Sequence, residues 1–493
     1  MKKTRKIVTV LTAALLSMCS IFSACGTTTQ GKKPDYSSSE KEYTFWAYSQ
    51  TCDDWYQVNG ERFYFEDGTR QTLENTKLCA DAGFNVLFID WTFPYQGPSG
   101  YADSKVKTVL DYAYEAGMKA FVFASDLHRL SATEESLINA EKADGVKFFE
   151  SEAALEKYVA DYLAPIIEHP AFYGVSLRDE PKWQMLEAIG QVYRAVQKAA
   201  PGAWCNMNIN PMYEGLEHMY CPEGNSVGVV TAYKKYLDLY YEHIGQYCGY
   251  IQYDDYPILK DGAILSYHLQ NAQIVAEYCK EKGMQFGKVF QTCAYDAELV
   301  RVTTTKTDMR WQLNIGMAMG IKDYSYYTYY PTVNLNEAPP DLEAFIVTRE
   351  GKPLERYYWL KDMHEEMQFN AKALMNFEYQ ALNYAFKTPI PGNKSFLAGV
   401  KSQELTDIKK VTLDSAGVVL TTEQYDKAND RRGYYVMNVT APSQVTEIKV
   451  TLEISGYKNV QIYNGKTVTE KKVKNGTVSF YLSTGEGVFV IPY

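Results

Sequence analysis

The sequence has few histidines and no cysteine spacing that is typical of a metal site or a redox motif. Its 493 residues include six histidines and nine cysteines, and no two cysteines form a Cys-x-x-Cys pair. Cys19 lies in an apolar leader and Cys25 directly follows that leader, which leaves seven cysteines, an odd number. The spacing therefore argues against a zinc site, and we expect no metal and no other cofactor. Whether a disulfide forms stays open.

A glycine-rich phosphate loop is also absent, and positive charge is scarce. No predicted strand is followed by a Gly-x-Gly-x-x-Gly turn, which argues against a dinucleotide-binding enzyme. The 60 acidic residues outnumber the 50 basic ones, giving a net charge of −10. Without the four basic residues of the leader, 46 basic residues remain against 60 acidic ones, a net charge of −14. Such a surface repels polyphosphates, so we expect no nucleic-acid partner.

Tyrosine is abundant, with 42 residues against 21 phenylalanines. Rings that carry a hydroxyl group suit a protein that stacks on polar ligands such as sugars and hydrogen-bonds to them. A tyrosine-rich core explains the same count, so composition alone leaves both interpretations open.

The amino terminus has the layout of an export signal. Basic residues in MKKTRK precede an apolar run from Ile7 to Met18, and small residues precede Cys25. We therefore predict a signal peptide over residues 1–24 and a polar, flexible tether over residues 25–42.

The segment Ile21-Phe22-Ser23-Ala24-Cys25 resembles the lipobox of bacterial lipoproteins, with Phe22 where leucine is usual. The resemblance implies cleavage before Cys25, lipidation of its thiol, and an extracytoplasmic protein anchored to the cell membrane. Ordinary secretion, with Cys25 merely near the cleavage point, is the alternative.

Short β-type runs alternate with helical stretches over residues 43–378, the pattern of repeated βα units around a parallel sheet. Eight strands separated by amphipathic helices over this length favour an α/β fold of the (β/α)8 TIM-barrel type. The predicted strands are Tyr43–Tyr48, Asn85–Asp90, Lys119–Ser125, Tyr173–Arg178, Ala203–Ile209, Tyr250–Tyr253, Gly287–Thr292 and Tyr324–Tyr329.

The sequence pattern changes after a last predicted barrel helix at about Tyr357 to Phe377. Residues 379–493 carry alternating β-type segments separated by Gly, Asn and Pro turns, which predicts a small C-terminal antiparallel β-sandwich. Examples of these segments are Gly433–Val439, Glu447–Ile454, Val460–Tyr463, Thr477–Leu482 and Gly487–Ile491.

In a barrel of this kind, the working residues lie where each strand ends and its βα loop begins. The fourth predicted strand ends in Arg178-Asp179-Glu180-Pro181. Partial burial of Glu180 would raise its pKa and let it hold a proton near neutral pH, as a catalytic acid must. A structural ion pair between Arg178 and Glu180 is the alternative.

This strand end resembles the large clan of barrel-fold retaining glycosidases, which carries its acid/base glutamate after strand four, typically as Asn-Glu-Pro. Further similar segments occur in family 42 β-galactosidase-like proteins and in uncharacterised glycosidase-like bacterial lipoproteins. The resemblance implies hydrolysis of O-glycosidic bonds in extracellular oligo- or polysaccharides, with Glu180 as general acid/base. The segments are Thr307–Gln312, Ala318–Gly320, Tyr324–Tyr329 and Gly485–Val490.

Two positions depart from the pattern of that clan. Asp179 replaces the usual asparagine, and the seventh strand ends in Gln291-Thr292 where the nucleophilic glutamate should stand. A second carboxylate must therefore come from elsewhere at the strand ends. Asp254 is the first choice, before a Tyr-Pro turn, and Asp255 is the second, because adjacent strand residues point to opposite sides. Capping of the following loop is the structural alternative for both.

A different mechanism also fits the pair Asp179-Glu180. In substrate-assisted glycosidases the 2-acetamido group of the sugar is the nucleophile, and an aspartate beside the acid orients it. The remaining polar and aromatic residues at the strand ends are candidates for substrate binding. They are Asp90, Trp91, Asp126, His128, Arg178, Asp179, Asp255, Tyr256, Gln291, Tyr327 and Tyr329.

The main competing hypothesis is a non-catalytic carbohydrate-binding lipoprotein, a degenerate glycosidase barrel that keeps the groove and lacks one carboxylate. The missing glutamate on strand seven favours it. A transporter's solute-binding protein is a third hypothesis, but such proteins have two lobes, which does not fit eight strands and a terminal sandwich. A carbohydrate substrate is the partner expected under the first two hypotheses.

Overall fold

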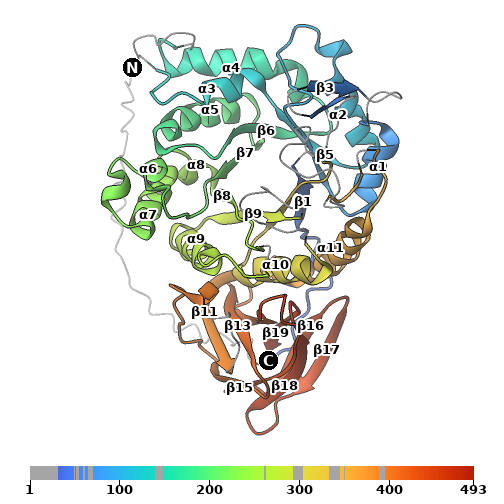
Figure 1. Cartoon of the computed structure of the whole chain (residues 1–493), viewed down its shortest axis with the longest axis vertical. Helices are drawn as coiled ribbons and strands as arrows, with labels where there is room; N and C mark the ends of the chain where they lie inside the picture. Colours follow the sequence, from blue (N-terminus) through green and yellow to red (C-terminus); the bar gives the residue numbers. More distant parts are fainter. Residues whose placement is uncertain are drawn as a thin grey trace, which may run out of the picture.

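The computed structural model describes residues 31–48, 50, 55–58, 61–64, 70–138, 148–259, 262–292, 304–331, 345–348, 350–387 and 395–493. The predicted signal peptide and the predicted lipidation site Cys25 lie outside these residues. Figure 1 shows two units, a ring of strands and helices and, beside it, a unit built from strands alone.

The first unit is a parallel eight-stranded sheet in the order β1-β10-β9-β8-β7-β6-β5-β4. Its helices surround the strands in Figure 1. Each of the eight predicted runs overlaps one of these strands, so the prediction of a TIM barrel is confirmed. The strands are β1 (Thr44–Ala47), β4 (Val86–Ile89), β5 (Lys119–Phe123), β6 (Phe172–Asp179), β7 (Trp204–Ile209), β8 (Tyr250–Asp254), β9 (Gln285–Gln291) and β10 (Asp323–Tyr327).

The helices of the barrel unit follow the strands in chain order, with short helices in the connections. Their bounds are α1 (Leu73–Asp81), α2 (Lys105–Glu115), α3 (Ser125–Leu130), α4 (Glu152–Ile167), α5 (Leu186–Ala199), α6 (Glu217–Tyr220), α7 (Val229–Tyr240), α8 (Gln246–Cys248), α9 (His268–Lys282), α10 (Lys306–Met319) and α11 (Glu355–Leu374). Helix α9 ends at Gly283, which has the left-handed conformation with φ of 68° that suits a glycine C-cap.

Side chains close the seam between the first and last strands of the sheet order, β1 and β4. Asn85, just before β4, donates its backbone N–H to the carbonyl of Phe45 at 3.1 Å and accepts from the Phe45 N–H at 2.8 Å through Oδ1. Gln50 accepts from the Phe88 N–H at 2.8 Å. These amides supply partners for backbone groups that a regular ladder would otherwise pair.

The second unit is an antiparallel β-sandwich, which confirms the predicted fold class of the carboxyl-terminal part. A six-stranded sheet has the order β11-β13-β14-β19-β16-β17, and a three-stranded sheet has the order β12-β15-β18. Apolar side chains such as Val436, Val450 and Val490 pack between the sheets. The strands are β11 (Glu378–Lys387), β12 (Ile408–Leu413), β13 (Gly417–Asp426), β14 (Arg431–Asn438), β15 (Glu447–Ile454), β16 (Asn459–Asn464), β17 (Thr467–Lys472), β18 (Thr477–Ser483) and β19 (Gly487–Pro492).

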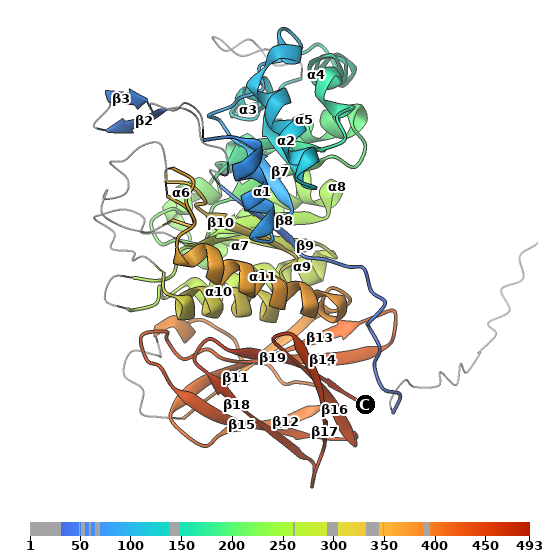
Figure 2. The same cartoon turned by 90° about the vertical axis from the view of Figure 1, so that its right-hand side faces the viewer.

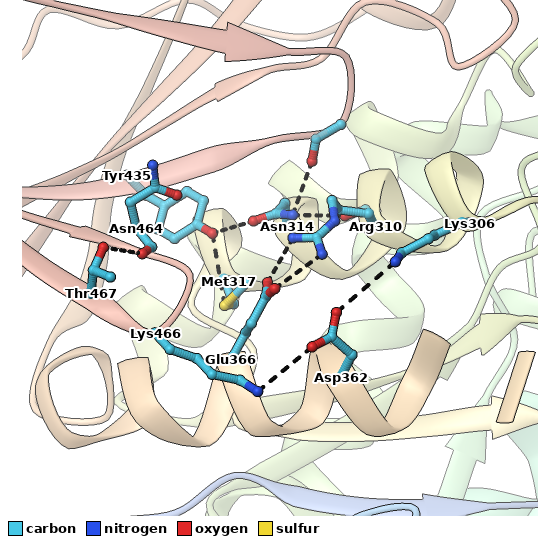
Figure 3. A network of polar contacts seen from close by, with 11 residues as sticks. Lys306, Arg310, Asn314, Met317, Asp362, Glu366, Tyr435, Asn464, Lys466 and Thr467 are labelled. Atoms are coloured by element: carbon cyan, nitrogen blue, oxygen red, sulfur yellow. Dashed lines mark hydrogen bonds and ion pairs between the residues drawn. The ribbon is translucent and has the colours of Figure 1, made fainter. Parts of the chain in front are cut away.

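The sandwich packs against helices α10 and α11 through a polar network (Figure 3). Arg310 of α10 forms a two-point ion pair with Glu366 of α11, at 2.7 and 3.2 Å. Asn314 donates to the carbonyl of Gly485 at 2.9 Å and accepts from the Tyr435 hydroxyl. The sandwich therefore holds the outer side of the barrel wall rather than the strand ends.

The described part of the predicted tether lies on the sandwich. Tyr36 donates to Asp426 at 2.7 Å, and its ring centroid is 5.7 Å from that of Phe377. Arg431 donates to the carbonyl of Lys32 at 3.0 Å. Tyr36 and the backbone of Lys32 therefore contact the sandwich. Among the described helices, none combines the length and the apolar character that a membrane crossing requires.

Candidate active site at the barrel mouth

The carboxyl end of β6 presents Asp179 and Glu180 at the barrel mouth, by which we mean the carboxyl ends of the eight strands. The register between β6 and β7 shifts between Ser176 and Arg178, so that Asp179 rather than Arg178 pairs with Asn208. This bulge turns Asp179 toward the inside of the barrel, where simple alternation from Ser176 would place Arg178. The sequence alone does not reveal such a shift.

Glu180 follows in a left-handed backbone conformation, with φ of 43°. Its N–H donates to the carbonyl of Asn208 at 2.7 Å, which holds this turn against β7. The next residue is held as well, because the Pro181 carbonyl accepts from Asn210 and from the hydroxyl of Tyr236. Left-handed φ in a residue with a side chain is costly and is concentrated at functional sites.

Asp179 accepts a hydrogen bond from the Asn208 amide at 3.0 Å and from the Tyr48 hydroxyl at 3.4 Å. Desolvation by the surrounding protein raises the pKa of Asp179, although these hydrogen bonds and the charge of Arg178 oppose the shift. The residue stays open toward solvent, as does Glu180. Both carboxyl groups are therefore accessible to a ligand.

Asp254 supplies a third carboxyl group, at the end of β8. Its side chain is 7% exposed, and its Oδ1 has no hydrogen-bond partner among the described residues. Burial raises the pKa of Asp254 well above its usual value, and the negative charges of Glu180 and then Asp179 raise it further. The carboxyl groups of β6 and β8 therefore share one electrostatic environment, in which the buried Asp254 holds a proton most readily.

The strand between them, β7, contributes two asparagines that point to the same side. Asn206 and Asn208 are 1% and 2% exposed, and the Oδ1 atom of each lacks a donor in the part of the chain that the structure describes. Buried acceptors without donors are unfavourable unless water or a ligand supplies the hydrogen bond. Together with Asp254, the mouth thus offers three such acceptors to hydroxyl groups.

Tyrosines surround this acidic cluster. The ring of Tyr327 lies 6.3 Å from that of Tyr48 and 5.5 Å from that of Tyr256, measured between centroids. Burial, followed by the nearby carboxylates, raises the pKa of the Tyr48 and Tyr256 hydroxyls, which therefore stay protonated. The site combines rings, hydroxyl donors and carboxyl groups, the set of groups that binds a polar ring-shaped ligand.

Asp255 points to the opposite side of the barrel wall, as alternation predicts. Its carboxylate contacts the His268 ring of α9 and lies 3.8 Å from the ammonium of Lys288 on β9, with all three side chains at most 2% exposed. Burial lowers the pKa of Lys288 to about 8, against the attraction of Asp255 and Asp254. Asp255 is thus paired outside the barrel and is no candidate for contact with a substrate.

Of the remaining predicted residues, some lie at or beside the mouth and the others make contacts within the protein. Arg178 donates to His128 Nε2 at 2.8 Å beside the mouth, and burial, then the Arg178 charge, lowers the pKa of His128 to about 4, so this ring is neutral at physiological pH. Trp91 is exposed at the end of β4. The others have structural contacts: Asp90 accepts from the backbone and hydroxyl of Thr92, Asp126 from Tyr158 and Arg129.

Gln291 and Tyr329 also face protein. The Gln291 amide exchanges hydrogen bonds with the backbone of Ile258 at 2.9 and 3.2 Å, which fastens the connection after β8. Tyr329 packs edge-on against Phe84 at 5.5 Å, on the helix side of the barrel wall. The structure therefore brings Asp179, Glu180, Asp254, Tyr256 and Tyr327 together, and it places these two residues elsewhere.

Tyr48, Asn206 and Asn208 also belong to this cluster. The spacing of the two asparagines, two apart on a strand, is the sequence feature that points to one face of the sheet. Tyr48 follows β1 directly, at the same end of the barrel.

The described residues contain no group of three His, Cys, Asp or Glu side chains arranged to hold a metal ion. Cys79, Cys205, Cys221, Cys248 and Cys279 are free thiols. A cavity of about 650 Å³ lies on the outside of the barrel, lined by Glu152, Arg194 and Tyr247 among others, and none of the candidate residues lines it.

Neither a protein-family profile nor a curated protein matches the chain. Solved structures with a similar course of the chain include an α-amylase from Anoxybacillus, with 11% identity over 93% of this chain and 99% of that chain and a TM-score of 0.49. An α-L-fucosidase from Paenibacillus thiaminolyticus has 9% identity over 86% of this chain and 96% of its own, with a TM-score of 0.48.

A β-galactosidase from the psychrophilic Marinomonas ef1 has 10% identity over 67% of this chain, with a TM-score of 0.41. The match spans 60% of that enzyme's length. These likenesses concern the course of the chain alone, so the function proposed below rests on the residues of the barrel mouth.

Proposed function

We propose that this protein hydrolyses O-glycosidic bonds in oligo- or polysaccharides, with Glu180 and Asp254 as its two carboxyl groups. The observation that carries the proposal is that Glu180, directly after β6, lies near enough to the buried Asp254 at the end of β8 for its charge to raise the pKa of Asp254. Cleavage of a glycosidic bond needs one carboxyl group that donates a proton and a second that is ionised. Glu180 and Asp254, at the same end of the barrel, supply these two carboxyl groups.

The electrostatics favour a definite distribution of the proton. Asp254 is the more buried group, and burial, followed by the charge of Glu180, raises its pKa, so we assign the proton to Asp254. Asp254 then acts as the general acid, and the exposed Glu180 acts on the sugar or on a water molecule. This distribution reverses the roles that the resemblance of strand four implies.

The surrounding side chains suit a sugar substrate. The side-chain oxygens of Asn206 and Asn208, which have no donor within the described ranges, can accept hydrogen bonds from hydroxyl groups. Tyr48, Tyr256 and Tyr327 offer rings and phenolic hydroxyls. A neutral sugar also avoids the repulsion that an anionic substrate would meet beside three carboxyl groups.

The test uses the protein from Gly26 onward, a panel of oligo- and polysaccharides, and measurement of released reducing ends. Glu180→Gln and Asp254→Asn should each lower turnover by about 10²- to 10⁴-fold. Asp161→Asn, which removes an exposed carboxylate on α4, is the matched control and should match the wild type. Turnover that survives both site variants would overturn the proposal.

The pH dependence of kcat/KM in the residual activity separates the two roles. Loss of the general acid removes the fall in rate at high pH, and loss of the ionised carboxylate removes the fall at low pH. We expect Asp254→Asn to remove the alkaline limb and Glu180→Gln the acidic limb. The opposite result would restore the roles implied by the resemblance.

A non-catalytic carbohydrate-binding protein is the second candidate function, because the seventh strand ends in Gln291, whose amide is engaged with Ile258. It predicts sugar binding by the wild type without release of reducing ends. For either function we also propose an extracytoplasmic location with a lipid anchor on Cys25, based on the lipobox-like segment. Cys25→Ala should then move the protein from the membrane fraction to the soluble fraction.

A further inference from the structure

A β-hairpin stands beside the barrel mouth, in the connection between β1 and α1. Its strands are β2 (Trp55–Val58) and β3 (Glu61–Tyr64), and Figure 2 shows them projecting from the barrel. A connection from a barrel strand to its following helix leaves from the carboxyl end of the strand, the end that carries Glu180 and Asp254. The hairpin is therefore placed on the working side of the barrel.

One face of this hairpin gathers aromatic and cationic groups. Trp55 pairs with Tyr64 across the two strands, and Arg62, two residues before Tyr64, lies on the same face. The Arg62 guanidinium carbon stands 4.0 Å from the centre of the Trp55 ring, a cation–π contact. This contact restricts the Trp55 ring and keeps guanidinium N–H groups beside it.

Trp91 joins this face from a different loop. It follows β4, and its ring centroid lies 6.3 Å from that of Trp55 with the ring planes at 64°. Trp91 is 51% exposed and Tyr64 is 63% exposed. Two separate βα loops thus bring three rings and one guanidinium group together at the mouth, with much of their surface in contact with water.

We propose that Trp55, Arg62, Tyr64 and Trp91, here called the hairpin platform, bind a neutral pyranose ring of an oligosaccharide at a distance from the bond that is cleaved. This inference rests on the proposed function and names a second binding position for its substrate. The C–H face of the sugar stacks on the rings, and its hydroxyl groups accept from the guanidinium.

The charges at the mouth favour a neutral sugar over other occupants. The carboxyl groups of Asp179, Glu180 and Asp254 lie on the same side of the barrel, and the whole chain has a net charge of −10. An acidic polysaccharide or an anionic lipid surface is repelled by both. A single guanidinium, already stacked on a ring, suits hydroxyl groups better than a polyanion.

The experiment measures binding and hydrolysis separately. Binding of cellohexaose, xylohexaose, mannohexaose and chitohexaose is measured by calorimetry in the Glu180→Gln background, where hydrolysis is suppressed. We expect Trp91→Ala and Tyr64→Ala each to raise the Kd of the hexaose that binds by about two- to tenfold, while Trp91→Phe retains most of the affinity because it keeps a ring. Tyr114→Ala, which removes an exposed tyrosine on α2, is the matched control and should bind like its parent.

Each outcome has a definite meaning. Unchanged affinity in both Trp91→Ala and Tyr64→Ala, or the absence of any binding to the four hexaoses, overturns the hairpin platform. Binding that depends on Trp91 and Tyr64 in a wild-type protein that releases no reducing ends supports the platform and overturns hydrolysis. Far-ultraviolet circular dichroism confirms that each variant is folded, and Tyr64, on an outlying hairpin, provides a second site if Trp91→Ala fails to fold.

Discussion

The mouth of the barrel and its floor, by which we mean the amino ends of the eight strands, each contain a buried aspartate. The two aspartates differ in the hydrogen bonds that their carboxyl oxygens accept. At the floor, Asp323 begins β10 and accepts from Trp46 and from Gln252, both at 2.9 Å. At the mouth, Asp254 ends β8 with one oxygen that has no partner among the described residues. Burial raises the pKa of both carboxyl groups, to about 7 for Asp323 and well above the usual value for Asp254.

The difference separates a structural carboxyl group from one that is available for chemistry. At the floor, hydrogen-bond donors contact Asp323. Gly287 leaves room for the Tyr250 hydroxyl there, since a Cβ atom at position 287 would lie 2.1 Å from that hydroxyl. At the mouth, one oxygen of Asp254 has no hydrogen-bond partner among the described residues, and the negative charges of Glu180 and Asp179 lie near it. A perturbed pKa is thus common to both ends of the barrel, and the pattern of hydrogen bonds distinguishes them.

The largest expected effect comes from Asp254→Asn at the mouth. Turnover should fall by about 10²- to 10⁴-fold, because an amide holds no exchangeable acidic proton. Thermal stability should stay about the same, since the protonated Asp254 is neutral, like the amide that replaces it. Differential scanning calorimetry beside the rate assay checks this, and a large drop in Tm would show that Asp254 is structural like Asp323.

The second prediction concerns the buried Asp255, which lies on the opposite side of the barrel wall from Asp254. Lys288→Met removes the ammonium that faces this buried carboxylate, and the lost pair should cost about 3–5 kcal/mol of unfolding free energy. Urea denaturation measures the loss. Lys157→Met, which removes an exposed ammonium on α4, is the control and should change stability by less than about 1 kcal/mol. Equal stabilities for the two variants would contradict the assignment of a buried pair.

The third prediction concerns the pH dependence of stability that the floor imposes. The pKa of Asp323 is about 7 in the folded protein and about 3.8 when unfolded, so the folded state binds more protons between these values. Stability should therefore fall as pH rises from about 4 to about 7, by up to about 4 kcal/mol. Asp323→Asn should flatten this part of the curve relative to the wild type. Parallel curves for the two proteins would show that Asp323 does not cause the fall.

The smallest expected effect is that of Tyr48→Phe at the mouth. The change removes the hydroxyl that donates to Asp179 at 3.4 Å, and it leaves the ring in place. Loss of one such hydrogen bond costs about 0.5–1.5 kcal/mol, which corresponds to roughly a two- to tenfold fall in kcat/KM. Steady-state kinetics measure it, with Tyr358→Phe on the exposed side of α11 as the control. A fall beyond about 100-fold would give Tyr48 a direct catalytic role.

The strands, and the candidate residues at their ends, were readable from local patterns. Short β-type runs and turn residues predicted the eight barrel strands and β15, whose bounds Glu447–Ile454 match the prediction. The same patterns gave no indication of β11, β12, β13 and β17. In β17 all residues are exposed, so the strand lacks the alternation of buried and exposed residues on which the prediction depends.

The sequence by itself determined the fold class and the acidic character of the strand ends, because burial periodicity and chain order are local properties of the chain. Only the tertiary structure decided which acidic side chains lie close to one another. A bulge turns Asp179 inward, and strands β6 and β8, on either side of β7, bring Glu180 and Asp254 into one electrostatic environment. Pairing with Lys288 and His268 keeps Asp255 outside. Such relations depend on contacts between residues far apart in the chain, and no local pattern encodes them.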